Sequence, residues 1–98
     1  MILKTIVKNW AVVHIKDELS PFRILWATIL LDERNSSFKS GEFVCTSRVL
    51  FIEDNQVRTH TGSLYVLTGP GAEYVGSYDD LLQLMEGHSP AELKLEII

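Results

Sequence analysis

The stretch GEFVCTSRVLFIEDNQVRTHTGSLYVLTG, residues 41–69, decides the fold of this 98-residue chain. Two turn signals separate three runs rich in β-branched and aromatic residues, which predicts a three-stranded antiparallel meander. A loop Glu53-Asp54-Asn55 would place Asn55 in the left-handed conformation, which Asn tolerates. A two-residue loop Thr61-Gly62 would use Gly62 at positive φ. The stretch specifies a β fold and carries no motif for a function.

These turn lengths predict a register, because side chains along a strand alternate between the two faces of a sheet. Val57, for example, would face Val66 across the second turn. One face would hold Phe43, Cys45, Val49, Phe51, Val57, Thr59, Leu64 and Val66. The opposite face would hold Arg48, Leu50, Arg58, His60, Ser63, Tyr65 and Leu67. The second face is mixed in polarity, so we expect it to need a cover, a partner or a ligand.

Length and composition predict a single domain spanning residues 1–98. A chain of this size buries roughly 60 to 65% of its unfolded surface, which is enough for a modest core. With 46% hydrophobic and 22% charged residues, the composition is that of an ordinary globular protein. The single Cys45 excludes an internal disulfide, and the N-terminal residues do not read as a secretory signal. We therefore expect a cytoplasmic protein.

Two classes of partner are disfavoured by the sequence. The longest apolar run, residues 24–31, is interrupted by Thr28 and is far shorter than the ~20 residues that span a bilayer. The net charge of −4 opposes non-specific binding to nucleic acid, which requires clustered Lys and Arg. We expect no membrane contact and regard nucleic acid as an unfavoured partner.

Two further strands are predicted ahead of the meander. The segment TIVKNWAVVHI, from Thr5 to Ile15, is rich in β-branched residues and predicts a first strand. The residues before Val7 stay open between strand and helix, because Ile2, Leu3, Ile6, Val7 and Trp10 would also line one side of a short helix. Residues 22–31 are apolar on both faces, which predicts an interior strand. Residues 32–40 are polar and predict a loop.

A helix is predicted after the breaker Gly69-Pro70-Gly71. Ser77 is a suitable N-cap, and carboxylates in the next turn favour the helix dipole. Tyr78, Leu81, Leu82 and Met85 recur at helical spacing, and Gly87 suits the end of the helix. The tail allows two interpretations. Its segment Ser89-Pro90-Ala91-Glu92 resembles a capping box that opens a second helix, whereas Leu93, Leu95 and Ile97 alternate as a strand does.

A family resemblance is carried by two patterns in the decisive stretch. They are Phe38-x-x-Gly41-Glu42-x-Val44-Cys45-Thr46-Ser47-x-Val49 and Val57-x-Thr59-x-x-Gly62-Ser63-x-Tyr65-x-Leu67-x-Gly69. They resemble an uncharacterised family of short bacterial proteins carried on integron gene cassettes and prophages. The likeness covers roughly residues 7–69 and includes Trp10 and Leu25-Trp26. It implies mobile-element cargo of unknown role and brings no catalytic residues.

The chemically reactive side chains do not assemble into a recognisable motif. Cys45 could act as a nucleophile with His60 or His14 as base, but the expected register points it inward, where a thiol behaves as a small hydrophobe. The three histidines, His14, His60 and His88, lack the close spacings of structural zinc sites. We therefore expect no catalytic residue, no metal site and no cofactor.

The sequence thus predicts an α+β, mainly β domain, a curved antiparallel sheet or small SH3-like barrel of about five strands with a C-terminal helix. We expect a non-enzymatic protein-binding or adaptor module with an unknown protein partner. The alternatives are a small nucleic-acid or nucleotide-binding domain and a small enzyme. The expected contact face holds Arg48, Leu50, Arg58, His60, Tyr65 and Leu67. A homodimer with Tyr65 and Leu67 in the contact would cover its apolar part.

Overall fold

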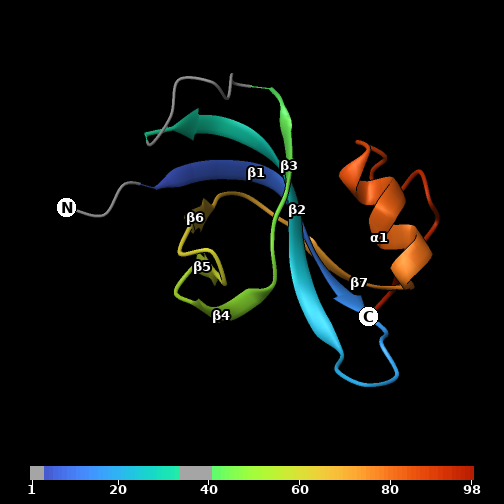
Figure 1. Ribbon diagram of the computed structural model, residues 1–98. Coiled ribbons are helices and arrows are strands. Elements are labelled where there is room, and N and C mark those ends of the chain that lie inside the picture. The colour runs from blue at the N-terminus through green and yellow to red at the C-terminus, as the bar shows by residue number, and fades with distance from the viewer. Residues whose placement is uncertain (1–3, 34–40) are drawn as a thin grey trace.

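The computed structural model describes residues 4–33 and 41–98 and shows a mainly β domain with one helix (Figure 1). In chain order the elements are β1 (Thr5–Ile15), β2 (Phe22–Asp32), β3 (Phe43–Cys45), β4 (Val49–Glu53), β5 (Gln56–Thr59), β6 (Leu64–Leu67), β7 (Ala72–Gly76), α1 (Tyr78–Met85) and β8 (Glu96–Ile97). The residues before the first strand, 1–3, and most of the predicted polar loop, 34–40, lie outside the described residues.

The sheet is mixed and open. Its main path runs β3-β2-β1-β6-β5-β4, with β7 beside β1 and β8 beside β7. The described chain thus forms eight strands, more than the five predicted, and β1 runs parallel to β6 and β7. The ends of the path, β3 and β4, do not pair with one another within the described residues, so the sheet does not close into the expected barrel. The mainly β class with a C-terminal helix is confirmed.

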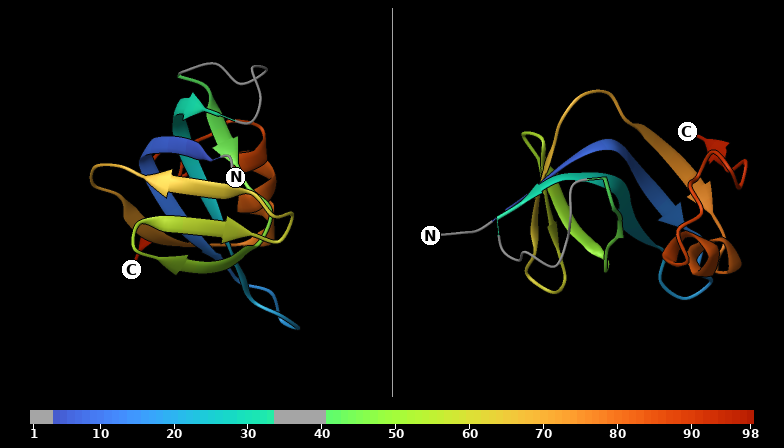
Figure 2. Two further views of the ribbon diagram at one scale, coloured as in Figure 1. Left: turned by 90° about the vertical axis from the view of Figure 1, so that its left-hand side faces the viewer. Right: turned by 90° about the horizontal axis from the view of Figure 1, so that it is seen from above.

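The long hairpin of β1 and β2 forms the centre of the molecule. Both predicted strands are confirmed, and β2 lies inside the sheet between β1 and β3. A bulge at Asn9 and Trp10 interrupts β1, and Asn9 there has φ 49°. On one side of the bulge β1 pairs with β6, and on the other side it pairs with β7. The bulge therefore divides the sheet into two limbs, which form an arch in the right-hand view of Figure 2.

The predicted breaker, Gly69-Pro70-Gly71, runs alongside β1 at this bulge. It connects β6 to β7, and the indole N–H of Trp10 donates to the Gly69 carbonyl at 3.0 Å. Gly71 lies so close to the Trp10 ring that a Cβ at this position would overlap it. A residue without a side chain is therefore required for the chain to pass from one limb to the other.

Each face of the β1–β2 hairpin is covered by a separate core. The first core lies beneath the β4–β6 strands, and we call it the hairpin-side core after the β4–β5 hairpin. Its buried members are Val7, Val12, Leu25, Ala27, Ile29, Val44, Val49, Val57, Tyr65 and Leu67. We call the second the helix-side core, because α1 covers it: Ala11, Val13, Ile15, Ile24, Leu81 and Leu84. Neighbours along each strand, such as Val12 and Val13, thus enter different cores, as strand alternation requires.

The helix is formed as its sequence predicts. The Ser77 hydroxyl accepts from the Asp80 N–H at 3.1 Å, and the Asp80 carboxylate accepts from the Ser77 N–H at 2.8 Å. This capping box begins α1, and Gly87 with φ 111° follows its end. Leu81 and Leu84 are the buried residues of the helix. The other apolar positions, Tyr78, Leu82 and Met85, are exposed instead of packed.

The tail contains both structures that its sequence allows, first a capped helical turn and then a short strand. The Ser89 hydroxyl accepts from the Glu92 N–H at 3.1 Å, and the Leu93 N–H donates to the Ser89 carbonyl at 3.2 Å, which makes a capped helical turn. The chain then extends, and β8 pairs with β7. Leu93 and Leu95 pack at the edge of the helix-side core, so the tail contributes to the cover of that face.

The predicted meander is present, but its two turn lengths are wrong. The first loop has two residues, because Glu53 pairs with Gln56 and both Asp54 and Asn55 have positive φ. The second loop has three residues, 60–62, because the N–H of Thr59 donates to the Ser63 carbonyl at 3.0 Å. Adjacent left-handed Asp and Asn favour the short type I′ loop, and a single left-handed Gly suits the longer one.

The changed turn lengths alter the register of β6. Val57 faces Tyr65, not Val66, although Val49 faces Thr59 as predicted. Tyr65 and Leu67 consequently lie in the hairpin-side core with exposed fractions of 5% and 7%. Phe51, expected to be inward, is exposed, because a bulge between Val49 and Phe51 changes the orientation of β4.

Candidate functional site

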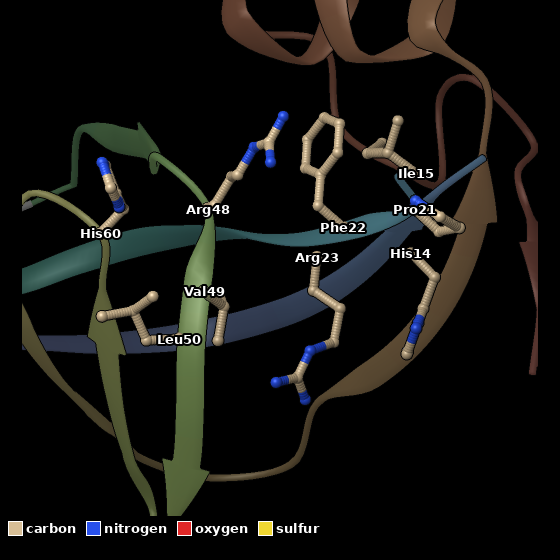
Figure 3. A pocket seen from close by; sticks show the side chains of 9 residues that line it. All are labelled: His14, Ile15, Pro21, Phe22, Arg23, Arg48, Val49, Leu50 and His60. Carbon is tan, nitrogen blue, oxygen red and sulfur yellow. The ribbon is translucent and has the colours of Figure 1, made fainter. Parts of the chain in front are cut away.

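A cleft of about 470 Å³ opens where the β1–β2 hairpin extends beyond its cover (Figure 3). At about 3.3 Å per residue, the 11-residue strands of the hairpin are roughly 20 Å longer than the five-residue β4. The hairpin-side face therefore remains uncovered at the end that holds the β1–β2 turn. The described residues that line the cleft are His14, Ile15, Pro21, Phe22, Arg23, Arg48, Val49, Leu50 and His60.

The lining of the cleft is cationic. Its positive charge comes from two arginines; two histidines, which are charged only when protonated, also line it, and no carboxylate occurs among its described lining residues. His14 and Arg23 are paired across β1 and β2, and Figure 3 shows both side chains on the same side of the hairpin. Arg48 and His60 come from the opposite wall. Because the whole chain has a net charge of −4, this concentration of positive charge is local.

Arg48 is held in place by an aromatic ring. Its guanidinium carbon lies 4.5 Å from the centroid of the Phe22 ring, a cation–π arrangement. Its backbone carbonyl accepts from the N–H of His60 at 2.8 Å, which joins the start of β4 to the chain after β5. A guanidinium stacked on a ring still presents N–H donors at its edge, and their fork geometry suits carboxylate or phosphate.

His14 connects the cleft to β7. Its Nε2 lies 3.0 Å from Oε1 of Glu73, and the imidazole is charged in this pair only when it is protonated. His14 also lines a second, smaller cleft of about 360 Å³, together with Lys16, Asp17 and Glu18, and Pro21 is shared by both clefts. Asp17 and Glu18 thus line the second cleft, and Glu73 of β7 pairs with His14, but none of the three lines the first cleft.

The predicted contact face is only partly assembled. Arg48, Leu50 and His60 line the cleft together. Arg58 is half-buried, and its Nη1 donates to the Gly62 carbonyl at 3.4 Å. Tyr65 and Leu67 are wrong as contact residues because they lie in the hairpin-side core. This burial also removes them from the contact of a homodimer, and self-association stays a prediction.

Sequence reasoning missed the β1–β2 wall of the cleft. His14, Phe22 and Arg23 were not among the predicted contact residues, although they supply one of its two walls. A signal was present in the sequence, because Arg23 is the one charged residue at the start of an apolar strand. An Arg in a strand that is otherwise buried on both faces indicates that the cover ends before it.

A family model described as Domain of unknown function (DUF6957) matches residues 3–83. The chain belongs to the DUF6957 family. Neither the search of curated proteins nor that of solved structures gave a match. The expectation of an uncharacterised family is thereby confirmed, and the origin on a mobile element stays a prediction.

All nine lining residues fall within the DUF6957 region, between His14 and His60. The match extends into α1 and stops before the tail, so the capped turn and β8 lie outside it. The cleft is therefore formed by the family domain itself. No helix in residues 4–33 and 41–98 has the length and hydropathy needed to cross a bilayer.

Cys45 has the properties of a packing residue. It is half-buried at the edge of the helix-side core, where burial raises the pKa of its thiol to about 11. The thiol therefore keeps its proton at neutral pH, whereas nucleophilic cysteines need a lowered pKa. It is absent from the lining of the cleft that holds His14 and His60. In the part of the chain that is described, no three His, Cys, Asp or Glu residues are placed to hold a metal.

Proposed function

We propose that this DUF6957 domain is a non-enzymatic protein-binding or adaptor module that contacts an acidic partner protein through the cleft. The observation that carries the proposal is the presence of Arg23 and Arg48 in the lining of a cleft that has no carboxylate among its described lining residues. Arginine is favoured at protein interfaces because it combines a broad apolar stem with several hydrogen-bond donors. The partner protein would supply carboxylates that pair with Arg23 and Arg48.

The apolar residues of the cleft support the same proposal. Leu50 is 55% exposed at its rim, and Val49 and Phe22 contribute further apolar surface. Interfaces combine an apolar centre with polar groups around it. The family resemblance supports the further proposal that the protein is cytoplasmic cargo of an integron cassette or prophage.

Affinity capture from host-cell lysate tests the proposed function. The wild-type domain, an Arg23→Glu/Arg48→Glu variant and a Lys8→Glu/Lys94→Glu control serve as baits. The control makes the same change in charge at two exposed lysines that do not line the cleft. We expect a partner protein to be retained by the wild type and the control and lost with the cleft variant. Equal retention by all three baits would contradict the proposal.

A nucleotide-binding function is the second candidate. Its support is the volume of the cleft, which lies within the range of small-molecule sites, and the presence of two guanidinium groups that suit phosphate. Isothermal titration with AMP distinguishes it from the first candidate. Saturable AMP binding that Arg23→Glu/Arg48→Glu abolishes would favour the second candidate over the first.

A further inference from the structure

The free edge of β4 adjoins the cationic cleft. In the described sheet β4 is the last strand of the main path and pairs only with β5. Residues of β4 and of β2 line the same cleft. Figure 3 shows β4 between β5, which ends just before His60, and the wall that carries Arg23. The side of β4 that has no neighbouring strand therefore faces the arginine-bearing wall.

The backbone of this edge is oriented for strand pairing. In a hairpin with a two-residue loop, the residues next to the loop form a hydrogen-bonded pair, here Glu53 and Gln56. The next pair, Ile52 and Val57, is then a pair without mutual hydrogen bonds. The N–H and C=O groups of Ile52 consequently point to the free edge, where an added strand would find a donor and an acceptor.

The side chains around this edge select the kind of strand that could pair there. Leu50 and Phe51 are 55% and 44% exposed on β4 and provide apolar contacts. Arg48 directly precedes the first residue of β4, and both Arg48 and Arg23 line the cleft that adjoins this edge. Strand alternation would let a peptide with alternating acidic and apolar residues direct its carboxylates to one side and its apolar groups to the other.

We infer that an extended acidic peptide segment of a partner protein adds as a strand to the free edge of β4, with its carboxylates against Arg23 and Arg48. This inference rests on the proposed function and specifies its partner. Main-chain hydrogen bonds to Ile52 would supply affinity, and the arginines would supply the selection for acidic residues. A free carboxylate or phosphate would engage only the arginines and leave the edge of β4 unpaired.

Amide hydrogen exchange tests strand addition directly. The probe is an end-capped hexapeptide of alternating Glu and Val, titrated into the ¹⁵N-labelled domain, and the control peptide has Gln in place of Glu. We expect exchange of the Ile52 amide to slow at least about tenfold at saturation, because its N–H becomes hydrogen-bonded. Amides of β3, the opposite end of the sheet path, should keep their rates. The Gln peptide should bind at least about tenfold more weakly.

Two pairs of variants separate the backbone contribution from the charge contribution. Ile52→Pro removes the outward N–H and leaves the β4–β5 hydrogen bonds in place, so it should weaken peptide binding, whereas Ile52→Val should preserve it. Arg23→Gln should weaken binding, and Lys8→Gln should not. Should Ile52→Pro fail to fold, the exchange rate of Ile52 in the wild type decides the question.

The outcomes also separate this inference from the proposed function. Peptide binding without slowed exchange at Ile52, or binding of inorganic phosphate without binding of the peptide, would overturn strand addition. Capture of a partner protein through the arginines would in that case still support the proposed function. Slowed exchange at Ile52 with the Glu peptide, together with no captured protein, would support strand addition and count against the adaptor role.

Discussion

The two faces of the β1–β2 hairpin differ in how far their covers reach. On the helix-side face, Leu81 and Leu84 pack against Ile15 and Ile24, which lie near the end of the hairpin. On the hairpin-side face, the β4–β6 strands stop earlier and leave His14 and Arg23 in a cleft. The same two strands thus carry a closed apolar layer beneath α1 and, at their turn end, an open cleft whose lining includes Ile15 and Phe22 at the border of that layer. We infer that the helix-side face serves mainly stability and the uncovered end serves binding.

Leu84→Ala should have the largest effect on stability. Leu84 is fully buried in the helix-side core, and truncation of such a leucine costs about 3 kcal/mol. Leu82→Ala is the matched control, because Leu82 is 48% exposed on the same helix and its loss should cost well under about 1 kcal/mol. Urea denaturation measures both changes. Equal effects of the two variants would contradict the assignment of the helix-side core.

Gly71→Ala should be the next most destabilising change. The new Cβ would overlap the Trp10 ring and displace the segment that connects β6 to β7. We expect this to cost about 2 kcal/mol. A double-mutant cycle with Trp10→Leu tests the cause. If the cost of Gly71→Ala is unchanged in the Trp10→Leu background, the ring is not responsible.

Gly62→Val should destabilise the β5–β6 hairpin, which covers the hairpin-side core. Gly62 has φ 90°, which a β-branched residue adopts poorly, so we expect a loss of more than about 1 kcal/mol. Apart from its two chain neighbours, no atom of the described residues lies within 4 Å of a Cβ at this position, so the cost is conformational. The measurement is thermal denaturation, with Gly62→Asn as a control that should retain more stability. A wild-type melting temperature for Gly62→Val would refute the three-residue loop.

Cys45→Ala should cost roughly 1 kcal/mol at neutral pH, because it removes a half-buried group from the helix-side core. The pKa of the thiol is about 11 in the folded protein and 9.0 ordinarily, so folding favours the protonated form. This contribution is present below pH 9 and is lost as the pH rises to about 11. The stability difference between wild type and Cys45→Ala should therefore shrink across this window, as pH-dependent urea denaturation would measure. A constant difference would contradict the burial of the thiol.

Arg48→Gln should have the smallest effect on stability and a clear effect on binding. It removes an exposed cation–π contact with Phe22, which is worth about 0.5 kcal/mol. Capture of the acidic partner should nevertheless be lost, while Lys8→Gln changes neither property. A loss of stability as large as that of Leu84→Ala would show that the cleft is part of the core.

The contrast between α1 and the meander shows which signals in the sequence were sufficient. Ser77, Asp80 and Gly87 are capping signals within a few residues of one another, and they predicted the ends of the helix correctly. The two turns of the meander were equally local, but each allowed a loop of two or three residues. For the second turn the choice decides whether Tyr65 or Val66 enters the core, and β6 packs there beside its distant parallel neighbour β1.

By itself, the sequence determined the mainly β class, a first strand ending at Ile15, the capped helix and the positions of the turns at glycine and asparagine, because these depend on alternation, capping and φ preferences within short segments. Only the tertiary structure decided the burial of Tyr65 and Leu67, the change of partner along β1 at Asn9, and the placement of Arg23 and Arg48 in the lining of one cleft. These features depend on contacts between residues far apart in the chain. The cleft exists because α1 and the β4–β6 strands cover different lengths of the β1–β2 hairpin, and no local segment of the sequence encodes that difference.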